Sequence, residues 1–301
     1  MKAPARRLGG RLDHPDAVSV AAVHAVEVAV DKAAVDRGAS LACFAGRIPK
    51  ASHTPKETPM RFWQPKRALI LGHRGASMHA PENTLAAFRL ALEMGADGIE
   101  LDITPSADGV PMVIHDPDLE RTTDGKGDVR QLSAAEIQRY DAGIKFGSKY
   151  AGERVPTLRE VFEAFGTRTR YNLDMKTFYD ADRPIVRTVL ALIEEFKLEP
   201  YVLIASFSLD TLRWFTEESR KIRLGVLISQ HTPHMMREDG RRWGVRYEAL
   251  HPHHSLVDAQ AMRRARQHRK KMVVWTVNDP IRKREMAQLG VDAIITDDPT
   301  R

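Results

Sequence analysis

Residues 68–103 decide the fold, and they read ALILGHRGASMHAPENTLAAFRLALEMGADGIELDI. Residues 68–71 form a short apolar run of strand length. Residues 83–94 carry apolar side chains at helical spacing, and Gly95 follows as a stop signal. Residues 98–103 again have the character of a strand. The segment therefore predicts a strand, a helix and a second strand in succession.

The same alternation continues to the end of the chain. Further strands are expected at 110–115, 171–175, 201–206, 223–228, 247–251, 272–277 and 293–296. Further helices are expected at 132–140, 158–165, 185–196, 209–219, 258–269 and 280–289, with one more reaching about Arg242. Sustained alternation is typical of a parallel sheet covered by helices, and the count favours an α/β fold of the (β/α)₈ TIM-barrel type.

Two observations bear on the alternatives. The tight Asp108-Gly109 turn predicts one hairpin added to the parallel set. A doubly wound open sheet is the competing fold, but no G-x-G-x-x-G follows the first strand, which argues against its dinucleotide-binding version.

Composition narrows the class of protein. The chain has 301 residues, of which 43% are hydrophobic, so it can bury a sizeable core. No stretch approaches the roughly 20 apolar residues of a membrane span, and no stable membrane insertion is expected. Cys43 is the only cysteine, which excludes an intrachain disulfide and fits a reducing, cytoplasmic location.

The net charge of +6 raises the question of a nucleic-acid partner. The densest basic patch, residues 263–271, falls at the end of an expected helix, where cations complement the helix dipole. No run of five or more Lys or Arg occurs. We therefore expect no nucleic-acid partner.

Residues 1–65 differ from the rest and end in a turn-rich run at 48–55. They predict an N-terminal extension that is disordered, serves in targeting, or results from a start-site artefact with translation beginning at Met60. The barrel domain is expected to comprise residues 66–301.

Ionisable residues follow or interrupt several predicted strands. Glu100 and Asp102 are two apart, so they share one face of a strand, and Asp174 and Lys176 do the same. Carboxylates gathered at one barrel mouth repel each other unless a cation lies between them. Glu100, Asp102 and Asp174 offer hard oxygen ligands that suit Mg²⁺ or Ca²⁺.

Histidine and arginine at the same mouth favour phosphate chemistry. Arg74 offers a charged fork for phosphate oxygens, and the adjacent His73 can exchange a proton near neutral pH. His115 ends another apolar strand, and Lys176 can neutralise phosphate charge. A second metal site at residues 251–254 is disfavoured, because successive strand residues face opposite sides.

Several motifs together resemble the glycerophosphodiester phosphodiesterase family in its compact bacterial form. They are His73-Arg74-Gly75, Pro81-Glu82-Asn83-Thr84, Glu100-Leu101-Asp102, His115-Asp116, Asn172-Leu173-Asp174-Met175-Lys176, Trp275-Thr276-Val277-Asn278 and residues 290–297. The resemblance covers residues 67–299. It implies a barrel of the phospholipase-C-like phosphodiesterase type that cleaves glycerophosphodiesters to glycerol 3-phosphate and an alcohol.

The resemblance also implies roles for individual residues. His73 and His115 match the acid and base, and Glu100, Asp102 and Asp174 match the ligands of one divalent cation. Arg74, Lys176, Glu82 and Trp275 match substrate-binding positions. One departure stands out, because the family usually has Glu where this chain has Asp174. A lysophospholipase D and a non-catalytic phosphate-binding barrel are the alternatives, and the oligomeric state stays open.

Overall fold

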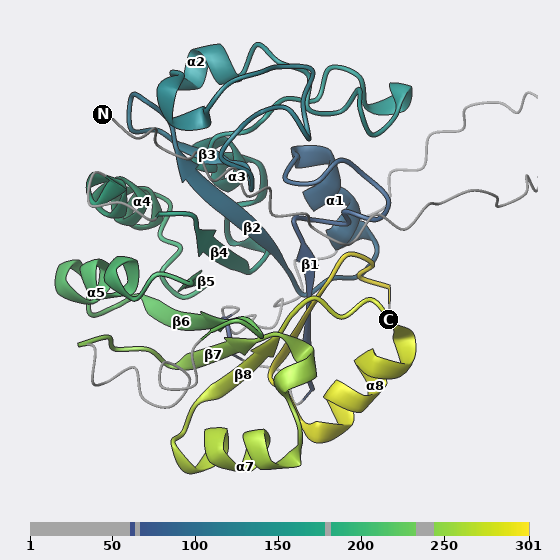
Figure 1. The fold of residues 1–301 in the computed structure, drawn as a ribbon, viewed down its shortest axis with the longest axis vertical. Helices are drawn as coiled ribbons and strands as arrows, with labels where there is room; N and C mark the ends of the chain where they lie inside the picture. The colour runs from purple at the N-terminus through teal and green to yellow at the C-terminus, as the bar shows by residue number, and fades with distance from the viewer. Residues whose placement is uncertain (1–60, 64–66, 178–181, 233–243, 301) are drawn as a thin grey trace, which may run out of the picture. The chain divides into compact units, whose positions relative to one another are not determined.

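A computed structural model describes residues 61–63, 67–177, 182–232 and 244–300. In that part of the chain, eight parallel strands form a closed barrel (Figure 1). They are β1 (Leu69–His73), β2 (Gly98–Pro105), β4 (Tyr171–Met175), β5 (Val202–Ser206), β6 (Arg223–Ile228), β7 (Ala249–Pro252), β8 (Lys271–Val274) and β9 (Ala293–Thr296). Strand β1 pairs with both β2 and β9, which closes the ring. The predicted barrel is confirmed, and the open-sheet alternative is wrong.

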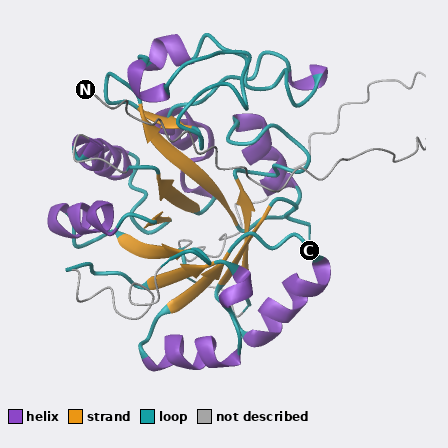
Figure 2. Ribbon diagram, in the orientation of Figure 1, coloured by secondary structure: helices purple, strands orange, loops and turns teal. Residues whose placement is uncertain are grey.

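Helices surround the strands on the outside (Figure 2). They are α1 (Leu85–Glu93), α3 (Leu158–Phe165), α4 (Pro184–Glu195), α5 (Leu209–Glu218), α7 (Ala259–Gln267) and α8 (Pro280–Leu289). Each begins and ends within three residues of its predicted bounds. The predicted helix reaching Arg242 falls largely on residues 233–243, which lie outside the described residues.

A hairpin and an insertion separate β2 from α3. Strand β3 (Pro111–Val113) pairs antiparallel with β2, as the Asp108-Gly109 turn predicts. The expected helix at 132–140 is only the four-residue α2 (Ala134–Ile137), because the amides of Arg139 and Tyr140 bond three residues back instead of four. Short 3₁₀ turns, η1 (Val129–Gln131) and η2 (Ser148–Tyr150), complete the insertion.

Alternation along the strands separates the helix-facing core from the barrel interior. On β2, Ile99, Leu101 and Ile103 pack in the large core beneath the helices. Glu100 and Asp102 occupy the alternate positions and point into the barrel. Strand alternation therefore delivers polar groups to the interior without interrupting the outer core.

The amino-terminal end of the barrel is closed by Phe62. Its side chain is fully buried among the inward-facing Leu69, Leu71 and Leu203. Its amide donates to the Pro200 carbonyl, 2.8 Å away. Residue 62, which falls within the predicted extension of residues 1–65, therefore packs against residues of the barrel strands. An isolated aromatic residue before the first strand carries no periodic signal.

Gly75 provides a test of how tightly the first βα turn is packed. Its φ is +90°, and a Cβ there would lie 2.6 Å from the backbone carbon of Ala87 in α1. We expect Gly75→Ala to destabilise the fold by about 1–3 kcal/mol beyond the backbone strain itself, because overpacking adds to that strain. Urea unfolding measures the loss.

The matched control is Gly109→Ala, where φ is +75° and no atom lies within 4 Å of the added Cβ. It carries the backbone strain without the steric clash. Equal losses in the two variants would contradict the close approach of α1 to the turn.

Candidate active site

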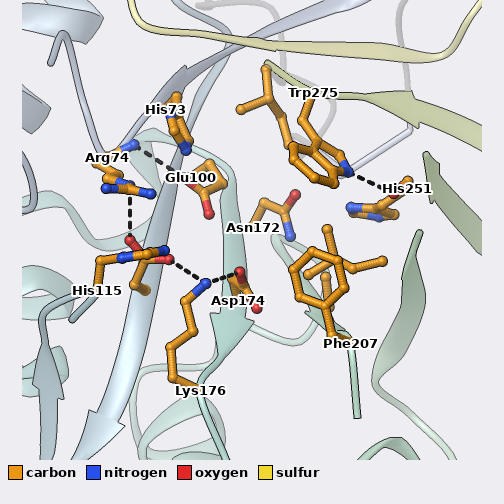
Figure 3. A pocket seen from close by; sticks show the side chains of 14 residues that line it. His73, Arg74, Glu100, His115, Asn172, Asp174, Lys176, Phe207, His251 and Trp275 are labelled. Atoms are coloured by element: carbon orange, nitrogen blue, oxygen red, sulfur yellow. Dashed lines mark hydrogen bonds and ion pairs between the residues drawn. The ribbon is translucent and has the colours of Figure 1, made fainter. Parts of the chain in front are cut away.

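The register of three neighbouring strands assembles the site at the carboxyl end of the barrel. His73 on β1 lies beside Glu100 on β2. Asp102 on β2 lies beside Asp174 on β4, and Glu100 lies beside Asn172. These side chains line a cavity of about 440 Å³, part of it open to solvent. Its lining also includes Arg74, His115, Lys176, Ala205, Phe207, Leu227, His251, Trp275 and Ile295 (Figure 3).

Three buried carboxylates form the centre of this cavity. Oxygen atoms of Glu100, Asp102 and Asp174 lie within 4.8 Å of one another, and no other such group of three ligands occurs among the described residues. Asp174 Oδ1 is buried without a hydrogen-bond partner. Burial, and then the charge of Asp102, raise the pKa of Glu100 to about 8. The oxygen set and the unpartnered Oδ1 fit a hard divalent cation.

Two cationic side chains offset part of this negative charge. Lys176 Nζ lies 2.5 Å from Asp174 Oδ2 and 3.1 Å from Asp102 Oδ1. Arg74 Nε lies 3.2 Å from Asp102 Oδ2. Burial opposes ionisation of Asp102, but Lys176 and then Arg74 outweigh it and lower the pKa of that carboxyl. Asp102 is therefore held as a carboxylate, whereas burial raises the pKa of Asp174.

The loop after β1 folds back onto the carboxylates. Arg74 adopts φ +55°, an unusual conformation for a residue other than glycine, and its amide donates to Glu100 Oε2 at 3.0 Å. Asn83 Nδ2 donates to Asp102 Oδ2 at 2.8 Å. The next residue, Thr84, caps the amino end of α1. The start of α1 is thereby tied directly to the site.

Glu82 lies behind Arg74 and does not line the cavity. Its Oε1 accepts from Arg74 Nη1 at 2.8 Å, and both its oxygens accept from Arg121. Arg121 also donates to Asp116. Glu82 therefore contacts the site through Arg74.

Each candidate histidine is held by a carboxylate. His73 Nδ1 lies 2.6 Å from Asp297 Oδ1, and His115 Nδ1 lies 2.6 Å from Asp116 Oδ1. A carboxylate only accepts, so each Nδ1 carries a proton and Nε2 is the nitrogen left for the cavity. Burial disfavours the charged form of His73, but the hydrogen bond to Asp297 and the charge of Glu100 outweigh it and raise the His73 pKa.

The opposite wall of the cavity carries two aromatic rings. Phe207 and Trp275 meet edge to face, with ring centroids 5.7 Å apart. Figure 3 shows them across from the ionisable groups, with His251 on their side and Asn172 in between. The site therefore has one face suited to an anion and one suited to carbon.

The histidines of residues 251–254 make separate contacts and do not bring three ligand atoms together. His251 is buried and lines the cavity. His253 bonds to Ser255, and His254 bonds to Arg282. A second metal site there finds no support among the described residues.

Some residues in the cavity or in contact with its neighbours have no role predicted from the sequence. Asn172 shares a strand face with Asp174, and the spacing of two residues was a usable signal. Phe207 comes directly after β5, at a position where barrel enzymes place site residues. Arg121 offered no signal, since Glu82, its partner, is 39 residues away.

The fold and the mouth together define a (β/α)₈-barrel enzyme with an anion-handling site. A family model described as the glycerophosphoryl diester phosphodiesterase family matches residues 73–301. The chain belongs to this family.

Individual relatives agree with that assignment. A glycerophosphodiester phosphodiesterase of Caldanaerobacter subterraneus is 38% identical over 239 residues, covering 77% of this chain and 95% of the relative. The structure of an Oleispira antarctica phosphodiesterase with the product sn-glycerol-3-phosphate superposes with a TM-score of 0.72 at 30% identity, covering 78% and 94%. A glycerophosphodiester phosphodiesterase structure from Agrobacterium tumefaciens gives 0.68 at 30% identity, covering 77% and 97%.

Within the described residues, no helix has the length and apolar character needed to cross a membrane.

The Asp297 contact predicts a measurable change at His73. Replacing Asp297 by Asn removes the carboxylate that favours the imidazolium, so the pKa of His73 should fall while burial continues to lower it. An NMR titration of the His73 ring, under the same metal conditions for each protein, measures the shift.

Asp298→Asn is the control, because Asp298 faces His79 and not His73. A His73 pKa that stays the same in Asp297→Asn, or falls equally in both variants, would contradict the pairing.

Proposed function

We propose that this protein hydrolyses glycerophosphodiesters to glycerol 3-phosphate and an alcohol. The observation that carries the proposal is that two carboxylate-held histidines line the same cavity as the buried acidic triad. Family membership supports the substrate class. The sn-glycerol-3-phosphate bound to the Oleispira antarctica relative supports the identity of one product.

One divalent cation, Mg²⁺ or Ca²⁺, belongs to the proposed enzyme. Glu100, Asp102 and Asp174 would hold it, and their oxygen donors suit either ion. When bound, such an ion supplies neutralisation of charge on the phosphate oxygens. The unpartnered Asp174 Oδ1 supports the presence of Asp174 in this set.

The proton transfers are proposed for His73 and His115. One ring takes the proton from the attacking oxygen, which belongs to water or to the glycerol hydroxyl. If the glycerol hydroxyl attacks, the product of this step is a cyclic phosphate, which water then opens to glycerol 3-phosphate. The other ring donates a proton to the alkoxide as its bond to phosphorus breaks. Asp297 and Asp116 keep each Nδ1 protonated, so Nε2 makes both transfers.

The remaining substrate contacts follow from the two walls. Arg74 and Lys176 bind phosphate oxygens and offset the charge that builds in the transition state. Glu82 contributes to substrate binding by fixing the Arg74 guanidinium. Trp275 packs against the carbon skeleton of the substrate.

The proposal also covers partners and location. The partner is a small-molecule glycerophosphodiester, without nucleic acid and without stable membrane insertion. A cytoplasmic location rests on the sequence, in which Cys43 is the only cysteine.

A single assay distinguishes this proposal from its alternatives. Turnover of glycerophosphocholine with Mg²⁺ or Ca²⁺, and much slower turnover of lysophosphatidylcholine, is the expected result. Preference for the lysophospholipid would indicate a lysophospholipase D. Binding of glycerol 3-phosphate without turnover of either substrate would indicate a non-catalytic barrel.

We expect His73→Ala and His115→Ala each to lower kcat for glycerophosphocholine by about 10²–10⁴-fold, the contribution typical of general acid–base catalysis. His268→Ala, at an exposed position after α7, is the matched control and should keep wild-type turnover. Wild-type turnover in both cavity variants would exclude the proposed roles.

Metal dependence is tested by binding as well as by activity. A chelator should abolish turnover, and Mg²⁺ or Ca²⁺ should restore it. In calorimetry, Asp174→Asn should weaken binding of the cation by about tenfold or more, since ligand charge sets affinity at such sites. The surface variant Asp210→Asn should bind as wild type does. Equal affinity in all three proteins would remove Asp174 from the ligand set.

A further inference from the structure

Two buried polar groups in the cavity are not used by the acidic triad or by the histidine pairs. The His251 side chain is fully buried, and neither ring nitrogen has a hydrogen-bond partner. Asn172 is 1% exposed, and its Oδ1 is also buried without a partner. Leaving such groups unpaired in a protein interior is destabilising. Both residues line the same cavity.

The His251 ring is held in place by its surroundings. A Cβ on residue 225 would lie 2.4 Å from His251 Nε2, so the ring lies against the glycine of the neighbouring strand β6. Trp275 Nε1 donates to the His251 carbonyl at 2.6 Å, which fixes the backbone of residue 251. Asn172 is fixed in turn, because its Nδ2 donates to the Leu203 carbonyl at 3.2 Å. Both side chains are therefore held in fixed positions, which indicates a preformed binding site.

The ligand chemistry follows from the charge of the two side chains. Burial lowers the pKa of His251 to about 3, so the ring is neutral near pH 7. A neutral imidazole offers one donor and one acceptor, and Asn172 Oδ1 adds an acceptor. A hydroxyl group both donates and accepts, so it matches this pair, whereas an anion would face the unpartnered acceptor Oδ1 of Asn172.

The positions of His251 and Asn172 in the cavity indicate which part of the substrate they can contact. Figure 3 shows His251 beside Trp275 and across the cavity from His73 and His115, with Asn172 between the two walls. Both groups are buried, so a small fragment can reach them while a bulky head group stays nearer the opening. Of the two substrate parts, the glycerol moiety is the small one that carries hydroxyls.

We propose that His251 and Asn172 form a hydroxyl-binding subsite for the glycerol moiety, and that this subsite makes the enzyme selective for a polyol over an alkyl chain. The inference rests on the proposed function. It adds a specificity role to two residues outside the acid–base and cation-binding sets.

The test compares two substrates that differ only in hydroxyls, glycerophosphocholine and n-propyl phosphocholine. We expect His251→Leu to lower the ratio of their kcat/KM values by about 10–100-fold, the equivalent of one or two lost hydrogen bonds. His251→Asn, which keeps a donor and an acceptor, should recover part of the ratio. His268→Leu makes the same substitution at an exposed position and should leave the ratio unchanged.

Two results would overturn the inference. One is an equal loss on both substrates in His251→Leu, which would indicate a purely structural role. The other is an unchanged ratio in a folded variant. If His251→Leu does not fold, the ratio in Asn172→Leu decides by the same criterion.

Failure of the proposed function is recognised separately, because the wild-type protein would then cleave neither substrate. In that case, and also if wild type cleaves only glycerophosphocholine because the glycerol hydroxyl is the attacking group, calorimetry with sn-glycerol 3-phosphate and n-propyl phosphate tests the subsite directly. Tighter binding of the glycerol compound to wild type, lost in His251→Leu, would support it. Equal binding of the two phosphates to wild type would overturn it.

Discussion

The burial of three carboxylates within 4.8 Å of one another is the constraint on which the rest of the site depends. Parallel pairing of β2 with β4 imposes it, since Asp102 and Asp174 occupy one register position. Buried like charges are costly unless neighbours or a cation compensate them. Lys176, Arg74 and the amide of residue 74 supply compensation within the chain. The strained backbone of Arg74 is explained by this requirement, because it brings that amide onto Glu100.

Most of the helices and strands could be predicted from the periodicity of apolar residues in the sequence. Strands β4, β6 and β9 and helices α3 and α8 begin and end at their predicted residues. The strands are short, largely apolar runs and α3 is amphipathic, whereas α8 is bounded by the start signal Asp279-Pro280 and the stop signal Gly290. Many of the site residues could also be predicted from the sequence, since side chains two residues apart on a strand share a face. The position of Phe62 and the contacts of Arg121 could not be predicted from the sequence. They depend on partners brought close only by the closed barrel, and no local pattern encodes such a partner.

His73 and His115 each pair with an aspartate, but different parts of the fold bring the two pairs together. Asp116 is the next residue after His115, so that pair depends on a local turn. Asp297 is 224 residues from His73 and meets it only because β1 pairs with β9, with Gly72 beside Thr296. The orientation of His73 is therefore coupled to closure of the whole barrel. A substitution that disturbs strand β9 should therefore affect the orientation of His73 more than that of His115.

Residue 174 is Asp where the family usually has the longer Glu, and the contacts of its two carboxylate oxygens explain how the shorter side chain fits the site. Oδ2 lies 2.5 Å from Lys176 Nζ, and Oδ1 is buried and unpartnered. One carboxylate thus serves a cationic side chain and leaves its other oxygen for the triad. Burial raises the pKa of Asp174, and Lys176 is the main influence that lowers it. Since Lys176 also bridges to Asp102, it ties both aspartates to one position. The Asp at residue 174 therefore keeps an oxygen within the triad because Lys176 occupies the other one.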